Sequence, residues 1–391
     1  MSGLQGKFSL FFLLVMLGLS LSGLAHAQKI MQVYEKPLPA ITLIPEADFD
    51  KTSNLFEGTP RDDETLAYSV RLPKDWVKEE DAMNALFGLS NRVLTELVRY
   101  NSPARMTSDR SYFSVQALLL DTQITTIQWF LPWAQERGLT LEGFRKNDDG
   151  SIDAMYVVLQ GDTTYLVRMK AQINGKNMIV VEYYSPSDVW QDEKRLQASV
   201  LHSFKLTNQK TQLIETMETH TFLDLAEFSY PVSWHLQAQP VRSADHMAAR
   251  IIKNSPTRAL NGQIDVNLVS QVVVESLPDE IEKFKKDLEV TGLLLNEKIE
   301  KKTDYNLDES VKFALVESYK ATDSRKRLVG YELWLAVMSA GDYYYFITLL
   351  TPSRDDDYAV WAYNSEIFRV VLESVKPRIV DGLPVAVPPR P

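Results

Sequence analysis

Four pairs of short landmarks recur in the same order along the chain, and this repetition constrains the fold more than any other feature of the sequence. The landmarks are a strand with a proline and a tryptophan, an Asn-Ser-Pro-x-Arg turn, a hairpin turn, and a Ser/Thr-Pro-Ser turn. In chain order, the pairs are residues 68–76 with 228–234, 101–105 with 254–258, 174–175 with 340–342, and 185–187 with 351–353. The two members of a pair are the same number of residues apart in the third and fourth pairs, and this number differs slightly in the first two. Duplicated units that later gained loop insertions would show this pattern. We therefore predict two related units.

Each unit is predicted to be α+β, which makes the chain two tandem α/β sandwich modules, each an antiparallel sheet packed with helices. Apolar and β-branched runs predict the strands. They lie at 112–120, 155–159, 164–173 and 178–184 in the first unit, and at 264–274, 311–321, 331–338 and 343–350 in the second. Asn174-Gly175 is a strong hairpin signal, because both residues tolerate positive φ.

A helix is expected between the early and late strands of each unit, and another helix at its end. In the second unit, Ser276 and Asp279 resemble a capping box at the start of the first of these helices. In the first unit the equivalent stretch, residues 124–138, contains Pro132, which predicts a kinked or split helix. Residues 79–100 are an additional stretch of the first unit and are expected to be partly helical.

The first 27 residues predict a secretory signal peptide, since one lysine precedes an apolar run that ends in Ala25-His26-Ala27. The alternative is an uncleaved anchor, because the apolar run is slightly shorter than a bilayer requires. Cleavage would release a chain that begins at Gln28 into a bacterial periplasm or outside the cell. The sequence has no cysteine, which excludes disulfides, thiol chemistry and a lipid anchor through cysteine.

The resulting division has six segments. They are a signal peptide at 1–27, an extended N-terminal segment at 28–64, a first module at 65–207, a linker at 208–219, a second module at 220–378, and a proline-rich C-terminal tail at 379–391. The two extended ends are too short and too polar to form cores, so each either covers a module or binds a partner.

An aromatic-Ser-Tyr-Pro strand leading to tryptophan, a late hairpin, a Ser/Thr-Pro turn and a helix ending in Ser-Phe together resemble the PsbP-like (DcrB-like) family. The residues that carry the resemblance are 228–234, 343–352 and 203–204, and it covers both modules. It implies a sandwich around an antiparallel sheet, with binding or assembly roles and no enzymatic activity. The first module departs from the pattern at residues 71–73 and in its additional stretch, and the second ends in Ser374-Val375.

The chain lacks the usual signatures of catalysis and metal binding. No histidine stands in a ligand spacing, and there is no nucleophile elbow, phosphate-binding loop or dinucleotide motif. The acidic runs 147–151 and 355–357 lack the spacing of a calcium loop, so we interpret them as turns or helix starts. We expect no catalytic residue, no cofactor and no metal. The net charge of −10 disfavours nucleic acid as a partner.

Five residues are the candidates for contacts with a partner: Asn101, Arg105, Asn254, Arg258 and Tyr344. The first four belong to the repeated Asn-Ser-Pro-x-Arg motif. The motif predicts a turn before a strand, while its arginines are able to clamp a carboxylate of a partner or of the other module. In the run 343–345, alternation places Tyr344 on the opposite face of its strand from its neighbours, where a partner has access to it.

The sequence therefore predicts a non-catalytic periplasmic protein that acts by protein–protein interaction in an envelope, secretion or conjugation complex, with no stable membrane span after cleavage. The alternative is a periplasmic protein that binds a small ligand between sheet and helix or between the modules. An enzyme without a recognisable motif is the third possibility. The sequence does not identify the partner.

Overall fold

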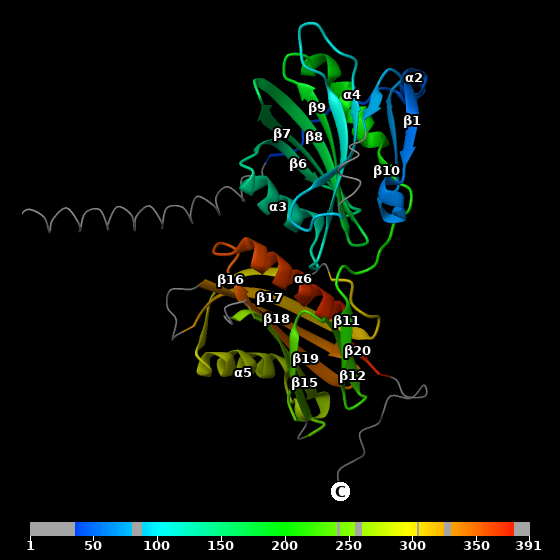
Figure 1. Ribbon diagram of the computed structural model, residues 1–391. Coiled ribbons are helices and arrows are strands. Elements are labelled where there is room, and N and C mark those ends of the chain that lie inside the picture. The colour runs from blue at the N-terminus through cyan, green and yellow to red at the C-terminus, as the bar shows by residue number, and fades with distance from the viewer. Residues whose placement is uncertain are drawn as a thin grey trace, which may run out of the picture. The chain divides into compact units, whose positions relative to one another are not determined.

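The computed structural model describes residues 36–79, 88–240, 243–254, 260–302, 305–323 and 330–378. The chain divides into two compact units, with the boundary between Ile214 and Glu215. Each unit contains one seven-stranded antiparallel sheet and one three-stranded sheet (Figure 1). Residues 1–35, which include the expected signal peptide, lie outside the described residues, as does the tail 379–391. Among the described residues, no helix has both the length and the apolar character that crossing a membrane requires.

The first unit has a sheet of strand order β3-β4-β5-β9-β8-β7-β6 and a second sheet of order β1-β2-β10. The large sheet comprises β3 (Val77–Glu79), β4 (Thr95–Asn101), β5 (Tyr112–Leu119), β6 (Thr140–Lys146), β7 (Ile152–Gln160), β8 (Thr163–Asn174) and β9 (Asn177–Pro186). The small sheet comprises β1 (Ser53–Gly58), β2 (Tyr68–Pro73) and β10 (Lys205–Leu206). The α-helices are α2 (Glu46–Thr52), α3 (Thr126–Glu136) and α4 (Trp190–Ser203).

The second unit repeats this order, with a large sheet β13-β14-β15-β19-β18-β17-β16 and a small sheet β11-β12-β20. Its large sheet comprises β13 (His235–Ala238), β14 (His246–Asn254), β15 (Leu260–Ser270), β16 (Leu293–Lys302), β17 (Val311–Asp323), β18 (Gly330–Ala340) and β19 (Tyr343–Pro352). Its small sheet comprises β11 (Met217–Phe222), β12 (Ala226–Pro231) and β20 (Lys376–Pro377), and its α-helices are α5 (Leu277–Val290) and α6 (Tyr358–Ser374).

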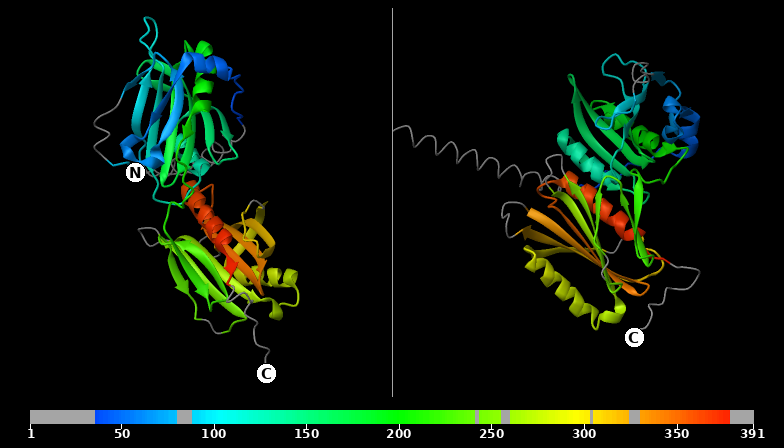
Figure 2. Two further views of the ribbon diagram at one scale, coloured as in Figure 1. Left: turned by 90° about the vertical axis from the view of Figure 1, so that its right-hand side faces the viewer. Right: turned by 60° about the horizontal axis from the view of Figure 1, so that its bottom comes forward.

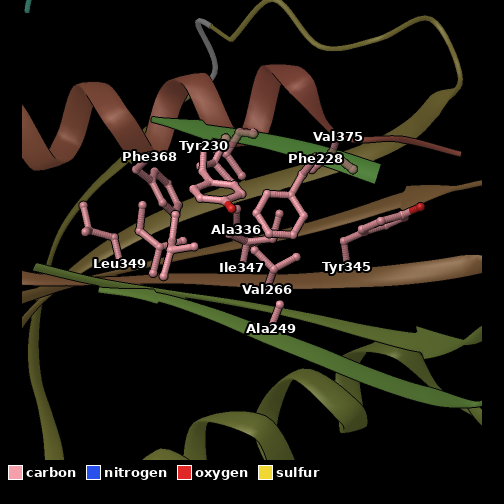
Figure 3. Packing of buried hydrophobic residues seen from close by; sticks show 14 of the residues in the cluster. Phe228, Tyr230, Ala249, Val266, Ala336, Tyr345, Ile347, Leu349, Phe368 and Val375 are labelled. Atoms are coloured by element: carbon pink, nitrogen blue, oxygen red, sulfur yellow. The ribbon is translucent and has the colours of Figure 1, made fainter. Parts of the chain in front are cut away.

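Both large sheets carry helices on their two faces, because their central strands present apolar side chains toward both sides. In the second unit, Phe346 of β19 packs under α5, while its neighbours Tyr345 and Ile347 belong to the core that α6 covers. Figure 2 shows α5, yellow-green, and α6, red, on opposite faces of this sheet. Figure 3 shows the α6 core, where Phe228 and Tyr230 of β12 meet Phe368 of α6.

The same serine contact ties the last helix of each unit to its small sheet. Ser203 of α4 accepts a hydrogen bond from the backbone N–H of Arg71 in β2 at 3.0 Å. Ser374 of α6 accepts one from the backbone N–H of Ser229 in β12 at 2.9 Å. The two units therefore resemble each other in side-chain contacts as well as in strand order.

Several boundaries differ from the sequence expectations. The N-terminal segment 28–64 was expected to be extended, but it contains α2 and β1, and β1 pairs with β2 along six residues. The expected linker 208–219 overlaps β11, which begins at Met217 and supplies the equivalent edge in the second unit. Both segments were underestimated because each contributes only a short edge strand to a small sheet, with weak apolar alternation of its own.

Three element assignments also need correction. Within the stretch 79–100, expected to be partly helical, residues from Thr95 onward form β4, since Val98 and Tyr100 alternate into the core, while residues 80–87 lie outside the described residues. Helix α3 is one continuous element that includes Pro132, so the expected split does not occur. Residues 271–273, expected as the end of a strand, form a short 3-10 helix that Ser270 caps.

Candidate functional site

Arg105 binds a carboxylate of its own unit. Its guanidinium forms an ion pair with Glu193 of α4, and it donates to Ser111 Oγ at 3.2 Å. Glu193 also accepts from Ser185 at 2.9 Å, so the repeated turns of the first unit meet at this carboxylate. The loop after β4 thus brings Arg105 to a carboxylate of α4, and its contact with a partner or with the other module stays a prediction.

The other candidate residues do not form a common site. Asn101 donates to Glu79 Oε2 at 2.7 Å across the β3–β4 pair. Asn254 is exposed at the end of β14, and Arg258 lies outside the described residues. Tyr344 faces α5 as alternation predicted, but it is half-buried against that helix's apolar cluster rather than fully accessible.

A different feature of the first unit has the character of a binding site, and it begins with an extended segment of the chain itself. Residues 36–38 run parallel to β6, where Leu38 N donates to Phe144 O at 3.2 Å and Phe144 N donates to Lys36 O at 3.0 Å. A Cβ at Gly143 of β6 would lie 2.7 Å from the backbone of Leu38, so only glycine permits this approach.

The same segment then crosses to α4. Arg195 donates to the carbonyl oxygens of Thr42 and Leu43 at 3.2 and 3.1 Å, and Ile44 N donates to Ser199 Oγ at 2.9 Å. Residues 36–44 are thus held mainly through backbone atoms, which is how a protein binds an extended peptide without selecting its side chains.

A cavity of about 700 Å³ lies beside this segment, within the volume range of small-molecule and peptide-side-chain sites. Residues 38–43 form one wall and α4 contributes a second wall. The remaining lining residues are Arg145, Asn147, Asp149, Asp153, Arg168, Lys170, Ala198, Leu201 and His202.

Charged residues on three adjacent strands form the floor of this cavity. Arg145 of β6 pairs in register with Asp153 of β7, which pairs with Lys170 of β8, so the three side chains share one face. Arg168 lies two residues before Lys170 and therefore on the same face. Arg145 and Asp153 form an ion pair, and Asn147 donates to Asp153 at 3.3 Å.

Arg168 and Lys170 remain without a counterpart. Neither side chain makes a hydrogen bond or ion pair with any residue that the structure describes, and the Nη1 atom of Arg168 is buried. Burial lowers the pKa of Arg168, although the charge of Asp153 opposes this shift. The floor of the cavity thus holds two half-buried cations that form no hydrogen bond or ion pair with the described residues, although the charge of Lys170 helps to lower the pKa of Asp149.

The second unit has an apolar residue at the equivalent place. Arg168 pairs in register with Tyr183, and Trp334 pairs in the same way with Leu349 of β19. Trp334 is buried, with its ring 5.7 Å from that of Phe368. The charged floor is therefore a difference between two units that share one strand order.

A second cavity of about 480 Å³ lies between α2, the small sheet and α4 in the first unit. It shares Leu43 and His202 with the first cavity, so the segment at Leu43 separates the two spaces. Two of its charged lining residues neutralise each other, because Arg71 forms an ion pair with Asp50 at 3.1 Å.

The acidic runs take structural roles. Asp149 accepts from Ser151 N at 2.9 Å, and Asp357 caps α6 by accepting from Val360 N at 3.1 Å. Within the described ranges, no group of three histidine, aspartate or glutamate side chains is arranged to hold a metal ion.

The charged floor was not predicted from the sequence. The alternation of Arg168 and Lys170 with buried Val167 and Met169 in β8 is typical of a strand with one solvent face. The available signal was the neighbouring strand β9, which is apolar toward both faces and so indicates that the charged face of β8 is covered.

Comparison with known proteins gives similarity to solved structures alone. No family model matches the chain, and no curated protein matches it. Cyanobacterial PsbP from Synechocystis is 15% identical over 43% of this chain and 98% of its own, with a TM-score of 0.27. The Ran-binding protein Mog1p of Saccharomyces cerevisiae is 11% identical over 41% of this chain and 94% of its own, with a TM-score of 0.29.

A third structure matches a larger part of the chain. The T6SS immunity protein TplEi from Pseudomonas aeruginosa is 12% identical over 84% of this chain and 99% of its own, with a TM-score of 0.21. PsbP-like structures are thus among those similar to this chain. Similarity of this degree carries no inference about what the chain binds.

Proposed function

We propose that the protein is a non-catalytic binding protein of the bacterial envelope, and that its first unit binds an extended segment of a partner protein. One observation carries the proposal: residues 36–44 lie in the first unit as a bound peptide does, and beside them an open cavity has two unpaired cations. Backbone hydrogen bonds supply affinity in such sites, and side-chain cavities supply specificity.

A small free ligand is the second candidate, and the volume of the cavity favours it, since about 700 Å³ is typical of sites for drug-sized molecules. The two candidates differ in what accompanies the protein from the cell. A small ligand would copurify and add a fixed small mass to the native protein. A protein partner would add no such mass.

Site-specific photocrosslinking in the cell of origin tests the proposal. A benzoylphenylalanine residue replaces Ala40, which is exposed and lines the cavity, and in the matched control it replaces Leu159, which is 67% exposed on β7. We expect one protein to be crosslinked at position 40 and not at position 159. No protein adduct at position 40, or the same adducts at both positions, would contradict partner binding at this cavity.

The adduct also shows which kind of partner is involved. An enzyme whose activity falls when it binds this chain would make the protein an inhibitor. A structural component of an envelope or secretion complex would make it an assembly factor.

The proposed location in the bacterial envelope depends on the signal peptide. We expect the mature protein to be recovered in the periplasmic fraction with Gln28 as its first residue, since Ala25-His26-Ala27 fits the cleavage site of a signal peptidase. N-terminal sequencing of that fraction checks this prediction, and recovery of the intact chain in the membrane fraction would favour an uncleaved anchor.

A further inference from the structure

A buried donor without an acceptor is costly, and the floor of the first unit's cavity retains one, Nη1 of the half-buried Arg168, beside the half-buried Lys170. A buried donor normally finds an acceptor in its own chain, because leaving it unsatisfied destabilises the fold. Nη1 of Arg168 has no acceptor among the described residues, although Asp153 lies on the neighbouring strand. Asp153 is instead occupied by Arg145 and Asn147.

We propose that Arg168 and Lys170 bind the carboxylate of a glutamate or aspartate side chain in an extended segment of the partner. This inference rests on the proposed function and names the chemistry of the segment. The planar guanidinium of Arg168 presents paired donors that match the two oxygens of a carboxylate, and Lys170 adds a point charge on the same face.

The charge balance of the floor favours a carboxylate over a phosphate. Arg145 and Asp153 neutralise each other, so Arg168 and Lys170 face Asp149 as the one remaining anion. The hydrogen bonds of Ser151 lower the pKa of Asp149, which keeps it charged at neutral pH. One excess positive charge suits a monoanion, whereas a phosphate near its second ionisation carries more negative charge than this floor balances.

The position of the floor favours a polypeptide as the source of this carboxylate. The cavity is bordered along one side by residues 38–43, which are themselves an extended chain. A second extended chain entering alongside would place alternate side chains toward the floor, since side chains of extended chains alternate between two sides. An acidic side chain at one of these positions reaches Arg168 and Lys170.

Selection of peptides on the mature protein tests the inference. A display library of random peptides is enriched on the wild type, on Arg168→Met/Lys170→Met, on Lys170→Arg, and on the control Lys176→Met. Lys176 is exposed in the β8–β9 turn and does not line the cavity. The melting temperature of each variant is measured first, and we expect the double variant to be at least as stable as the wild type.

We expect wild type and Lys176→Met to enrich peptides with an acidic residue at one fixed position. The double variant should lose this preference at least tenfold, while Lys170→Arg should retain it. Acetate, a carboxylate with a single charge, should compete with the selected peptides more strongly than inorganic phosphate does at equal concentration.

The possible failures are distinguishable. Enrichment of peptides without a fixed acidic residue, or equal acidic enrichment on the double variant, would overturn the carboxylate inference and leave peptide binding intact. Stronger competition by phosphate would overturn the charge argument. Failure to enrich any peptide on the wild type would instead contradict the proposed function itself.

Discussion

Two glutamates, Glu182 in the first unit and Glu332 in the second, are almost fully buried but have opposite electrostatic surroundings. Glu182 accepts hydrogen bonds from the neutral groups of Tyr156, Tyr184 and Gln116. Burial raises the pKa of Glu182, because these donors offset only part of the desolvation of its charge. The ionised form of Glu182 is therefore less stable in the folded protein than in the unfolded chain.

Glu332 is paired with a cation instead. Arg354 donates to it at 2.7 and 2.9 Å, and the indole N–H groups of Trp334 and Trp361 donate at 3.2 and 2.8 Å. Burial alone would raise the pKa of Glu332, but the hydrogen bonds and charge of Arg354 outweigh burial and lower it. The ionised form is the one that the fold stabilises.

Replacing each of these residues with glutamine is expected to have effects of opposite sign. Glu182→Gln should raise the melting temperature of the first unit at pH 7; the gain should shrink as the pH falls through the raised pKa of Glu182 and vanish below about 4.3, where the glutamate is neutral in both the folded and the unfolded chain. Glu332→Gln should destabilise the second unit by about 3 kcal/mol at pH 7, because Arg354 loses the nearer of its two carboxylate partners and keeps only Glu300 at 3.5 Å. That loss should shrink as the pH falls through the lowered pKa of Glu332.

Thermal unfolding of both variants and the wild type between pH 3 and pH 8, followed by circular dichroism, checks this pair. Equal shifts of the same sign at pH 7 would contradict the different environments of the two carboxylates. Each variant serves as the control for the other, since both remove one buried negative charge and preserve the side-chain shape.

Arg168 gives a further prediction at the scale of a single residue. Arg168→Met removes a buried nitrogen without an acceptor and keeps an unbranched side chain, so we expect an increase in stability of about 1 kcal/mol. Chemical denaturation with urea measures the change. A decrease of similar size would show that the guanidinium has a stabilising partner in the free protein and would argue against a site kept open for a ligand.

The individual site residues were the least predictable part of the molecule. The sequence indicated Arg105 as a possible clamp, and its carboxylate proved to be Glu193, 88 residues away in its own unit. It gave no indication of Arg168 and Lys170 as a site, because a local pattern does not reveal that a distant segment, 38–43, covers one face of β8. The surroundings of Arg105 and of Arg168 and Lys170 therefore depend on residues that are distant in sequence.

At the scale of elements, the starts of α3 and α5 provide a matched comparison. Thr125 and Gln128 form a capping box at α3, where Thr125 N donates to Gln128 Oε1 at 3.0 Å. Ser276 occupies the N-cap of α5 but its side chain makes no capping hydrogen bond, so the capping box expected at Ser276 and Asp279 is wrong. The side chain of Asp279 is one methylene shorter than that of Gln128.

Thr125→Ala should therefore destabilise the first unit by about 1 kcal/mol, the usual cost of losing an N-cap side chain. Ser276→Ala should change the second unit by no more than a few tenths of a kcal/mol, because it removes no hydrogen bond. Thermal unfolding of the two variants checks the difference. An equal loss in both would show that Ser276 caps α5 in solution.

Long strands with strong local patterns were predictable, and short edge strands were not. The bounds of four strands were predicted to within two residues, because turns and a hairpin signal border their apolar runs. These strands are β8, β9, β18 and β19. Strands β1, β11 and β20 were missed, since each is a short edge whose place depends on β2 or β12. Pro132 was overestimated as a helix breaker, because α3 continues through it.

At the scale of the whole molecule, each unit has a hydrophobic core built from its own residues. The core of the first unit draws on residues between Phe49 and Leu206, and that of the second on residues between Phe222 and Val375. Each unit also contains its own large sheet, small sheet and closing helix. Units of this size bury enough apolar surface to be stable alone.

We therefore expect residues 36–214 and 215–378 to fold as separate proteins, each with one cooperative thermal transition and dispersed amide resonances. A division within a unit, at the Gly341 turn between β18 and β19, is the matched control and should leave unfolded fragments, since it separates paired central strands. Selection of acidic peptides should remain with residues 36–214 alone, because the cavity and its wall lie wholly within them. A fragment 215–378 that is unfolded by itself, or acidic-peptide selection that requires both fragments, would show that the functional unit is larger than the unit that carries the cavity.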